Sequence, residues 1–256
     1  MQDPQTATAF FLGPVATAYL TACALWLAYD WRFSLARSEP PLDESKHPYW
    51  DLLLTFAAGA GIFLLGAAYR AGWLLPTGGT AAGRIGWLAD NCIIYSPIAI
   101  VLAVRRQSLQ TIFLSLTRLP EKVCLGLVLG VIAIVVYSGL RRELGEVPGY
   151  LASAVDVEKL VDFFPVFLEG VALAFAFVRL RWAVGMTAAI AIPSLLFAAA
   201  HVPGAIEAGR GTAHIAVFFA FNTALPAAIL WTVGRSGDVV WIGLVHYLMD
   251  IAIRAI

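Results

Sequence analysis

The sequence predicts an all-α fold, a polytopic membrane bundle of about eight transmembrane helices that forms one integral membrane domain over residues 1–256. The first observation is composition: 60% of the residues are hydrophobic and 13% are charged, whereas soluble domains have about 45–50% apolar and about 25% charged residues. The second is that uninterrupted apolar segments recur, and each approaches the length of about 20 residues that a helix needs to cross a bilayer. This composition excludes an ordinary water-soluble enzyme or binding module.

The apolar segments are continuous, without the strict alternation of barrel strands, and tryptophans lie near most of their ends, as interfacial anchors do. The predicted spans are residues 8–29, 50–69, 86–104, 121–140, 162–179, 183–201, 213–233 and 238–256. The connections between the last four are short, so we expect these four helices to be antiparallel neighbours in one compact bundle.

Charge and cysteine content limit the partners. Lys and Arg number 17, as do Asp and Glu, so there is no basic excess to hold nucleic acid. We expect membrane lipids as partners, and neither nucleic acid nor a soluble cofactor. Cys23, Cys92 and Cys124 lie in apolar segments without a CxxC pair. They predict small buried side chains, with neither disulfides nor a zinc finger.

Few ionisable residues lie inside the predicted spans, where each costs about 2.5–3.5 kcal/mol on insertion scales and therefore marks a functional position by default. They are Asp90, Glu169, His201, His246 and Asp250, with His214 near the start of a span. Most of the group belongs to the last four spans. We interpret Asp90 as a polar contact between helices and His214 as structural or interfacial.

Helix geometry predicts that four of these side chains converge. Glu169 lies about 10 Å into the fifth span, and His201 lies at the far end of the antiparallel sixth span, on the same side of the membrane. His246 and Asp250 are four residues apart and share one helix face. We expect them to meet in the half of the bilayer nearest residues 202–212, with Pro203 ending the sixth helix.

Such a group of two carboxyls and two imidazoles suits the hydrolysis of a peptide bond. Glu169 would take a proton from a water molecule that His201 orients. His246, held by Asp250, would donate a hydrogen bond to the carbonyl oxygen as that oxygen becomes negative.

The same residues resemble the motifs of the CPBP family of intramembrane proteases, which includes type II CAAX endopeptidases and Abi-like proteins. Phe197 to His201 matches its FxxxH motif, His246 to Asp250 matches HxxxN or HxxxD, and Glu169 matches the first glutamate of EExxxR. Gly170 and Ala174 stand where that motif has its second glutamate and its arginine, so the sequence departs from the pattern there.

The resemblance divides the chain into N-terminal helices over residues 1–120 and a CPBP-like catalytic core over 121–256. It implies a multi-pass endopeptidase of the bacterial cytoplasmic (inner) membrane, with Glu169, His201, His246 and Asp250 as catalytic residues. The substrate would be a peptide bond in a membrane-associated protein or peptide, such as a CAAX-like end, a C-terminal sorting tail or a leader. Two mechanisms stay open, one with zinc held by the glutamate and histidines and one without metal.

Other functions remain as alternatives. Gly170 and Ala174 favour an inactive relative that acts as a membrane scaffold. Buried acids and histidines also suit a proton-coupled transporter, although the sequence has no inverted repeat. Ser236 lies in a GxSG sequence like that of rhomboid proteases, but His246 is ten residues away, about 15 Å along a helix. We therefore interpret this GxSG segment as a glycine-rich tight turn.

The sequence also predicts residues for helix packing. The glycines at positions 59, 61, 126 and 130 suit close helix contacts. We expect Asn222, in the middle of the seventh span, to form a hydrogen bond with a neighbouring helix.

Overall fold

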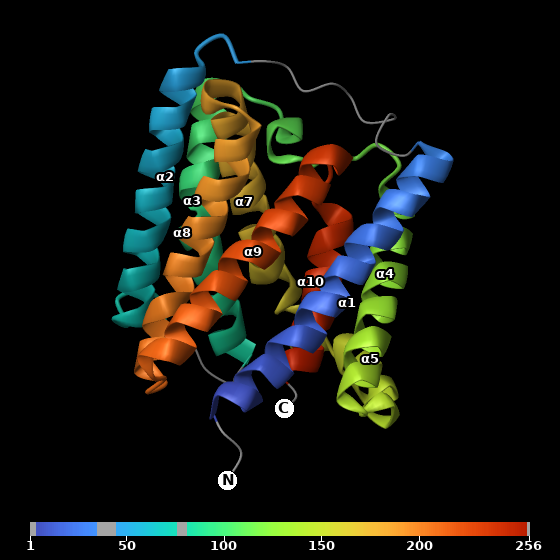
Figure 1. Ribbon diagram of the computed structural model, residues 1–256. Helices are drawn as coiled ribbons and strands as arrows, with labels where there is room; N and C mark the ends of the chain where they lie inside the picture. Colours follow the sequence, from blue (N-terminus) through green and yellow to red (C-terminus); the bar gives the residue numbers. More distant parts are fainter. Residues whose placement is uncertain (1–3, 35–44, 76–80, 255–256) are drawn as a thin grey trace.

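The computed structural model describes residues 4–34, 45–75 and 81–254, and these residues form helices and connecting turns without a strand. The all-α prediction is therefore confirmed. Helix α1 begins and helix α10 ends at the same end of the bundle, the lower end in Figure 1. We call this the lower end and the opposite one the upper end.

The long helices extend between the lower and upper ends of the bundle (Figure 1). They are α1 (Pro4–Phe33), α2 (Pro48–Arg70), α3 (Ala81–Arg105), α4 (Leu119–Arg141), α7 (Phe163–Val184), α8 (Met186–Glu207), α9 (Thr212–Ser236) and α10 (Val240–Arg254). Helices α1 and α9 are inclined to α2, α4 and α8 (Figure 1). The shorter helices are α5 (Val147–Ala154), α6 (Val157–Leu160) and the 3₁₀ helices η2 (Leu109–Ile112) and η3 (Leu144–Glu146).

Seven of the described helices are long and apolar enough to cross a membrane, so the chain is a multi-pass integral membrane protein. The predicted eighth span corresponds to α10, which has 15 residues and is shorter than the roughly 20 that a crossing requires. Helix α10 lies inside the bundle, where Val245, Met249 and Ala252 are fully buried. The apolar side chains of α10 are therefore explained by packing against other helices as well as by contact with lipid.

Glycines in α4 allow α10 to pack closely. A Cβ atom at Gly126 would lie 2.8 Å from the Cα of Trp241, and one at Gly130 would lie 2.5 Å from a methyl group of Leu248. The predicted small-residue seam is confirmed here. At Gly59 a Cβ would meet nothing within 4 Å, so the prediction of close packing is wrong at that position.

The predicted neighbour relations hold for part of the chain. Helices α7, α8 and α9 pack successively against one another, as expected. The expectation that α9 and α10 are neighbours is wrong, because α10 packs on α4, α7 and α5 and has at most marginal contact with α9. The glycine seam of α4 explains this, since it offers α10 a closer approach. Helix α1 packs against α4 and α9. The helices α7, α8, α9, α1, α4 and α10 thus form a closed ring of neighbours.

Two further expectations are corrected. Helix α8 continues through Pro203 to Glu207, because a membrane helix tolerates the single backbone hydrogen bond that proline removes. Cys23 is buried as expected, whereas Cys92 and Cys124 are exposed on the outside of the bundle. An apolar segment indicates a nonpolar environment, which in this protein includes the outer faces of helices.

Buried polar networks close the upper end of the bundle. Asp51 is fully buried and accepts hydrogen bonds from Arg105 at 2.6 Å and Gln107 at 3.0 Å. Arg179 of α7 donates to Gln107 at 2.5 Å, which connects α7 to α2 and α3. The members of this network lie at the ends of predicted spans, where their burial does not follow from the sequence pattern.

Candidate functional site

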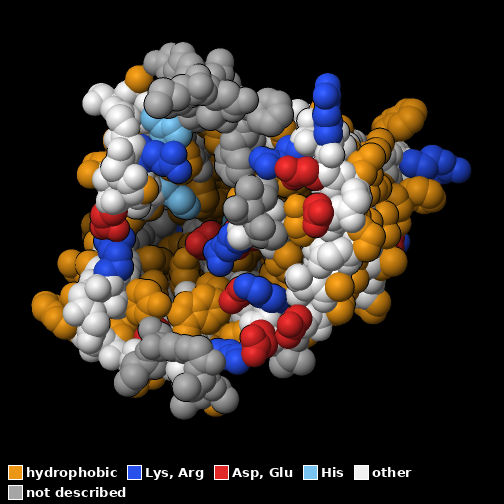
Figure 2. Space-filling view, turned by 90° about the horizontal axis from the view of Figure 1, so that it is seen from below, with side chains coloured by type: hydrophobic (Ala, Val, Ile, Leu, Met, Phe, Trp, Pro, Cys, Tyr) orange, Lys and Arg blue, Asp and Glu red, His pale blue; other side chains and the backbone are white. Residues whose placement is uncertain are grey.

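A cavity of about 290 Å³ opens between α1, α7, α8, α9 and α10. Figure 2 shows the lower face of the molecule hollowed, with hydrophobic side chains lining the hollow and charged side chains near its edge. Asp250 and Ile253, close to the end of α10, line the cavity, which places its mouth at the lower end. Most of the wall is apolar, so the few polar side chains in it determine its chemistry.

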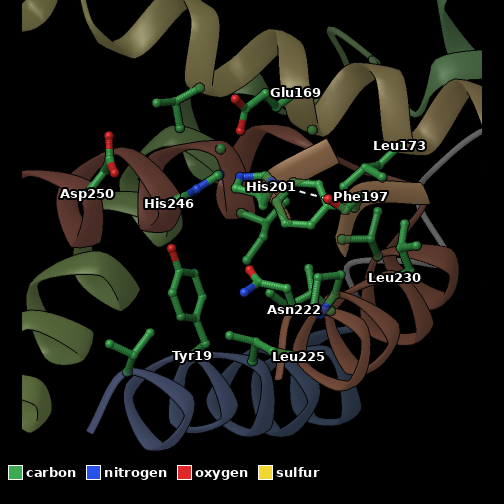
Figure 3. A pocket seen from close by; sticks show the side chains of 18 of the residues that line it. Tyr19, Glu169, Leu173, Phe197, His201, Asn222, Leu225, Leu230, His246 and Asp250 are labelled. Atoms are coloured by element: carbon green, nitrogen blue, oxygen red, sulfur yellow. Dashed lines mark hydrogen bonds between the residues drawn. The ribbon is translucent and has the colours of Figure 1, made fainter. Parts of the chain in front are cut away.

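All four residues predicted from the sequence line this cavity: Glu169 from α7, His201 from α8, and His246 and Asp250 from α10. In Figure 3, Glu169, His201 and His246 face the same space from three helices. Helix α7 runs upward and α8 runs downward, so a residue near the start of one and a residue near the end of the other lie at similar depth. The predicted convergence is therefore observed.

His201 is oriented by the motif that precedes it. Its Nδ1 lies 2.9 Å from the carbonyl oxygen of Phe197, and the two rings pack with centroids 4.4 Å apart. A carbonyl only accepts hydrogen bonds, so Nδ1 carries the proton and Nε2 of the neutral ring is left as an acceptor. The FxxxH spacing thus sets both the direction and the tautomer of this imidazole.

Asp250 does not hold His246, contrary to the expectation. Its carboxylate forms an ion pair with Arg254 at 2.8 Å, and no hydrogen bond joins it to His246 among the described residues. His246 and Arg254 both lie on the helix face of Asp250. Arg254 is a full cation on a long side chain, and it satisfies the carboxylate. The ring of His246 instead meets Tyr19 of α1 edge-on, with centroids 6.1 Å apart.

Glu169 and His246 have no hydrogen-bond partner within the described part of the protein, although both line the cavity. Both side chains are half-buried, and a polar group fully removed from water without a partner costs about 1–3 kcal/mol. Both side chains are therefore available to water or to a bound molecule, which distinguishes them from polar residues that stabilise the fold.

Two polar residues of the cavity were not identified as site residues from the sequence, Tyr19 and Asn222. The side chain of Asn222 donates a hydrogen bond to the carbonyl of Phe218, one turn earlier in its own helix, at 2.8 Å. The expected bond from Asn222 to a neighbouring helix is therefore wrong. Tyr19 belongs to the N-terminal helices, and the boundary at residue 120 does not separate the walls of the cavity.

The other candidates from the sequence lie outside the cavity. Ser236 is the buried last residue of α9, and its hydroxyl donates to the carbonyl of Val233 at 2.9 Å and accepts from the backbone of Asp238 at 3.1 Å. The tight-turn interpretation holds only for Gly237, which ends α9 with a φ of 63°, because Gly234, Arg235 and Ser236 belong to the helix. Asp90 is buried and accepts a hydrogen bond from the backbone of Leu75 at 3.0 Å, so it tethers the segment after α2 and not a neighbouring helix.

The sequence is compatible with a zinc ion held by Glu169, His201 and His246. The arrangement of these side chains does not favour such a site. No group of three His, Cys, Asp or Glu side chains that could hold a metal ion occurs in residues 4–34, 45–75 and 81–254. Glu169, His201 and His246 face one cavity (Figure 3), but they do not form a group that could hold a metal ion among the described residues, since zinc ligands must all lie within about 2.3 Å of one point.

A scan against protein-family models and searches of curated proteins and of solved structures found no match to this chain. What the protein does is therefore inferred from the residues of the cavity and their geometry.

Proposed function

We propose that the protein is an intramembrane endopeptidase of the CPBP type, which hydrolyses a peptide bond in a membrane-associated protein or peptide. The observation that carries the proposal is that Glu169, His201 and His246 face one largely apolar cavity. They also follow one another in the order of the family's motifs. The cavity opens at one end of the bundle, where a CAAX-like end, a C-terminal sorting tail or a leader would enter.

Attack by water is the first step of the proposed reaction. The water forms a hydrogen bond to Nε2 of His201, which directs its lone pair toward the carbonyl carbon. Glu169 accepts a proton from the water as the new carbon–oxygen bond forms. The electron pair of the carbonyl double bond moves onto the oxygen, and His246 donates a hydrogen bond to that negative charge.

Collapse of the tetrahedral intermediate completes the reaction. The carbon–oxygen double bond re-forms, and the carbon–nitrogen bond breaks with its electron pair moving to nitrogen. The protonated Glu169 returns its proton to that nitrogen, which leaves as an amine. One water is consumed, a carboxyl group and an amine are produced, and Glu169 regains its starting state.

The departures from the family motif are compatible with the space in the site. Gly170 lines the cavity, and a Cβ at this position would meet nothing within 4 Å. Ala174, in contrast, is fully buried and leaves no space for an arginine. The second glutamate and the arginine of the motif are thus missing together, and the proposed reaction assigns the water to Glu169 and His201 alone.

Replacing Glu169 with Gln tests the proposal, because the amide keeps the shape of the carboxylate and cannot accept the proton. Membranes that contain wild-type protein should yield new peptide termini, mapped by mass spectrometry, that are absent with Glu169→Gln. We expect at least a 10²-fold loss of cleavage, in line with the usual contribution of a general base.

The matched control is Glu158→Gln. Glu158 is also a glutamate, but it lies at the surface, outside the cavity, where its carboxylate is paired with Arg84. Its variant should give the wild-type set of termini. Identical termini from wild type and Glu169→Gln would reject the peptidase and leave the scaffold or transporter alternatives.

A further inference from the structure

We infer that Tyr19 of α1 is a catalytic residue of this site, whose hydroxyl donates a second hydrogen bond to the scissile carbonyl oxygen as it becomes negative. The inference rests on the proposed peptidase function and deepens it. It makes the first helix, which has no counterpart in the motifs of residues 121–256, part of the reacting site.

Tyr19 is a buried residue whose hydroxyl has no hydrogen-bond partner among the described residues. The residue is 6% exposed, lines the cavity, and forms no hydrogen bond with any described residue. Its hydroxyl points into the cavity, toward the level of His246 and Asp250 (Figure 3). Tyr29 on the same helix, in contrast, donates to Glu121 at 2.9 Å. The Tyr19 hydroxyl lacks such a bond, so water or a ligand in the cavity is the acceptor available to it.

Aromatic contacts fix the position of Tyr19. Trp26 is buried and stacks on Trp241 near the start of α10, with ring centroids 5.6 Å apart. Tyr19 precedes Trp26 by seven residues, or two helical turns, and therefore lies on the same face about 10 Å lower. Helix α10 runs in the opposite direction, so His246, five residues after Trp241, descends to meet Tyr19.

The chemistry of a phenol suits a donor and not a base. Its reference pKa is about 10, so at neutral pH it keeps its proton. It would act by hydrogen bonding alone, without proton transfer. In an apolar cavity, a donor that is already positioned stabilises developing negative charge strongly, and loss of one such donor typically lowers kcat by about 10²–10³-fold. Tyr19 and His246 would then form the oxyanion hole together.

The deciding variant is Tyr19→Phe, which keeps the ring contact with His246 and removes only the hydroxyl. The assay uses purified protein in liposomes and a quenched fluorescent peptide that spans a cleavage site mapped by comparing wild type with Glu169→Gln. We expect kcat to fall by about 10²-fold while KM changes less than about twofold, because the bond strengthens only in the transition state. Tyr29→Phe, the same change on the same helix outside the cavity, should retain wild-type turnover.

The outcomes separate the two proposals. Wild-type kcat in Tyr19→Phe, together with loss of activity in Glu169→Gln, would overturn the role of Tyr19 and leave the peptidase standing. A change in KM with unchanged kcat would also overturn it, because it would indicate ground-state binding. If wild type and Glu169→Gln produce the same termini, both proposals fall together.

Discussion

Polar side chains at the two ends of the bundle differ in whether they have partners within the protein. At the upper end, Asp51 accepts hydrogen bonds from Arg105, the last residue of α3, and from Gln107, which follows that helix. Lys122 forms a 2.6 Å ion pair with Asp238. Toward the lower end, Glu169 and His246 line a cavity and, among described residues, form no hydrogen bond. Fully buried groups are thus paired within the protein at the upper end, whereas the half-buried Glu169 and His246 are left for an outside partner toward the lower end.

The difference indicates distinct roles. The upper networks tie segments that are far apart in sequence: Lys122 joins the start of α4 to the turn before α10, and Arg179 donates to the carbonyl of Thr111 at 2.8 Å. They hold the helices that surround the cavity. Glu169 and His246 form no hydrogen bond within the described residues, so removing their polar groups should affect chemistry more than stability.

The largest effect on stability is expected from Lys122→Met at the upper end. This change removes the ammonium group beside the buried carboxylate of Asp238 and should cost about 3–5 kcal/mol, the range for breaking a buried ion pair from one side. The measurement is thermal or denaturant unfolding of the purified protein in lipid or detergent.

The controls for Lys122→Met come from the same chain. Adding Asp238→Asn should recover part of the loss, because the buried charge is then gone as well. Arg84→Met breaks an exposed ion pair with Glu158 and should cost at most about 1 kcal/mol. Equal losses for Lys122→Met and Arg84→Met would contradict the distinction between the two ends.

A smaller effect of the opposite sign is expected from Glu169→Leu in the cavity. This variant replaces an acid that lacks a hydrogen-bond partner among the described residues with an apolar side chain of similar size, so stability should be unchanged or rise by about 1 kcal/mol. Cleavage should be lost, as in Glu169→Gln. Destabilisation as large as that of Lys122→Met would show that Glu169 supports the fold, and it would remove the contrast on which the site depends.

The sequence predicts the helical class and the convergence of four residues because both follow from local rules. Apolar segment length indicates spans, and antiparallel succession puts Glu169 and His201 at similar depth. Spacing four residues apart puts His246 and Asp250 on one face. These relations need only residues within one span or in adjacent spans.

Contacts between distant segments could not be predicted in this way. Periodicity shows that Tyr19 shares a face with Trp26, but not that this face meets α10. The partner of Asp250 depended on a competition between His246 and Arg254 that spacing does not resolve, since both lie four residues away. Asp51 and Lys122 lie at span ends, where a charge usually faces water, and only the packed structure shows that they are buried.

The smallest effect on cleavage is expected from metal removal. This treatment tests whether the cavity side chains at the lower end hold a metal ion. Because no described group of three donors could hold a metal, incubation with 1,10-phenanthroline or EDTA should leave cleavage within about twofold of the untreated protein. Metal analysis of the same sample should find less than one equivalent of zinc. Loss of cleavage that returns on adding Zn²⁺ would mean that Glu169, His201 and His246 close around an ion. In that case His201 would serve as a metal ligand through Nε2, which is the nitrogen that its bond to Phe197 leaves as an acceptor.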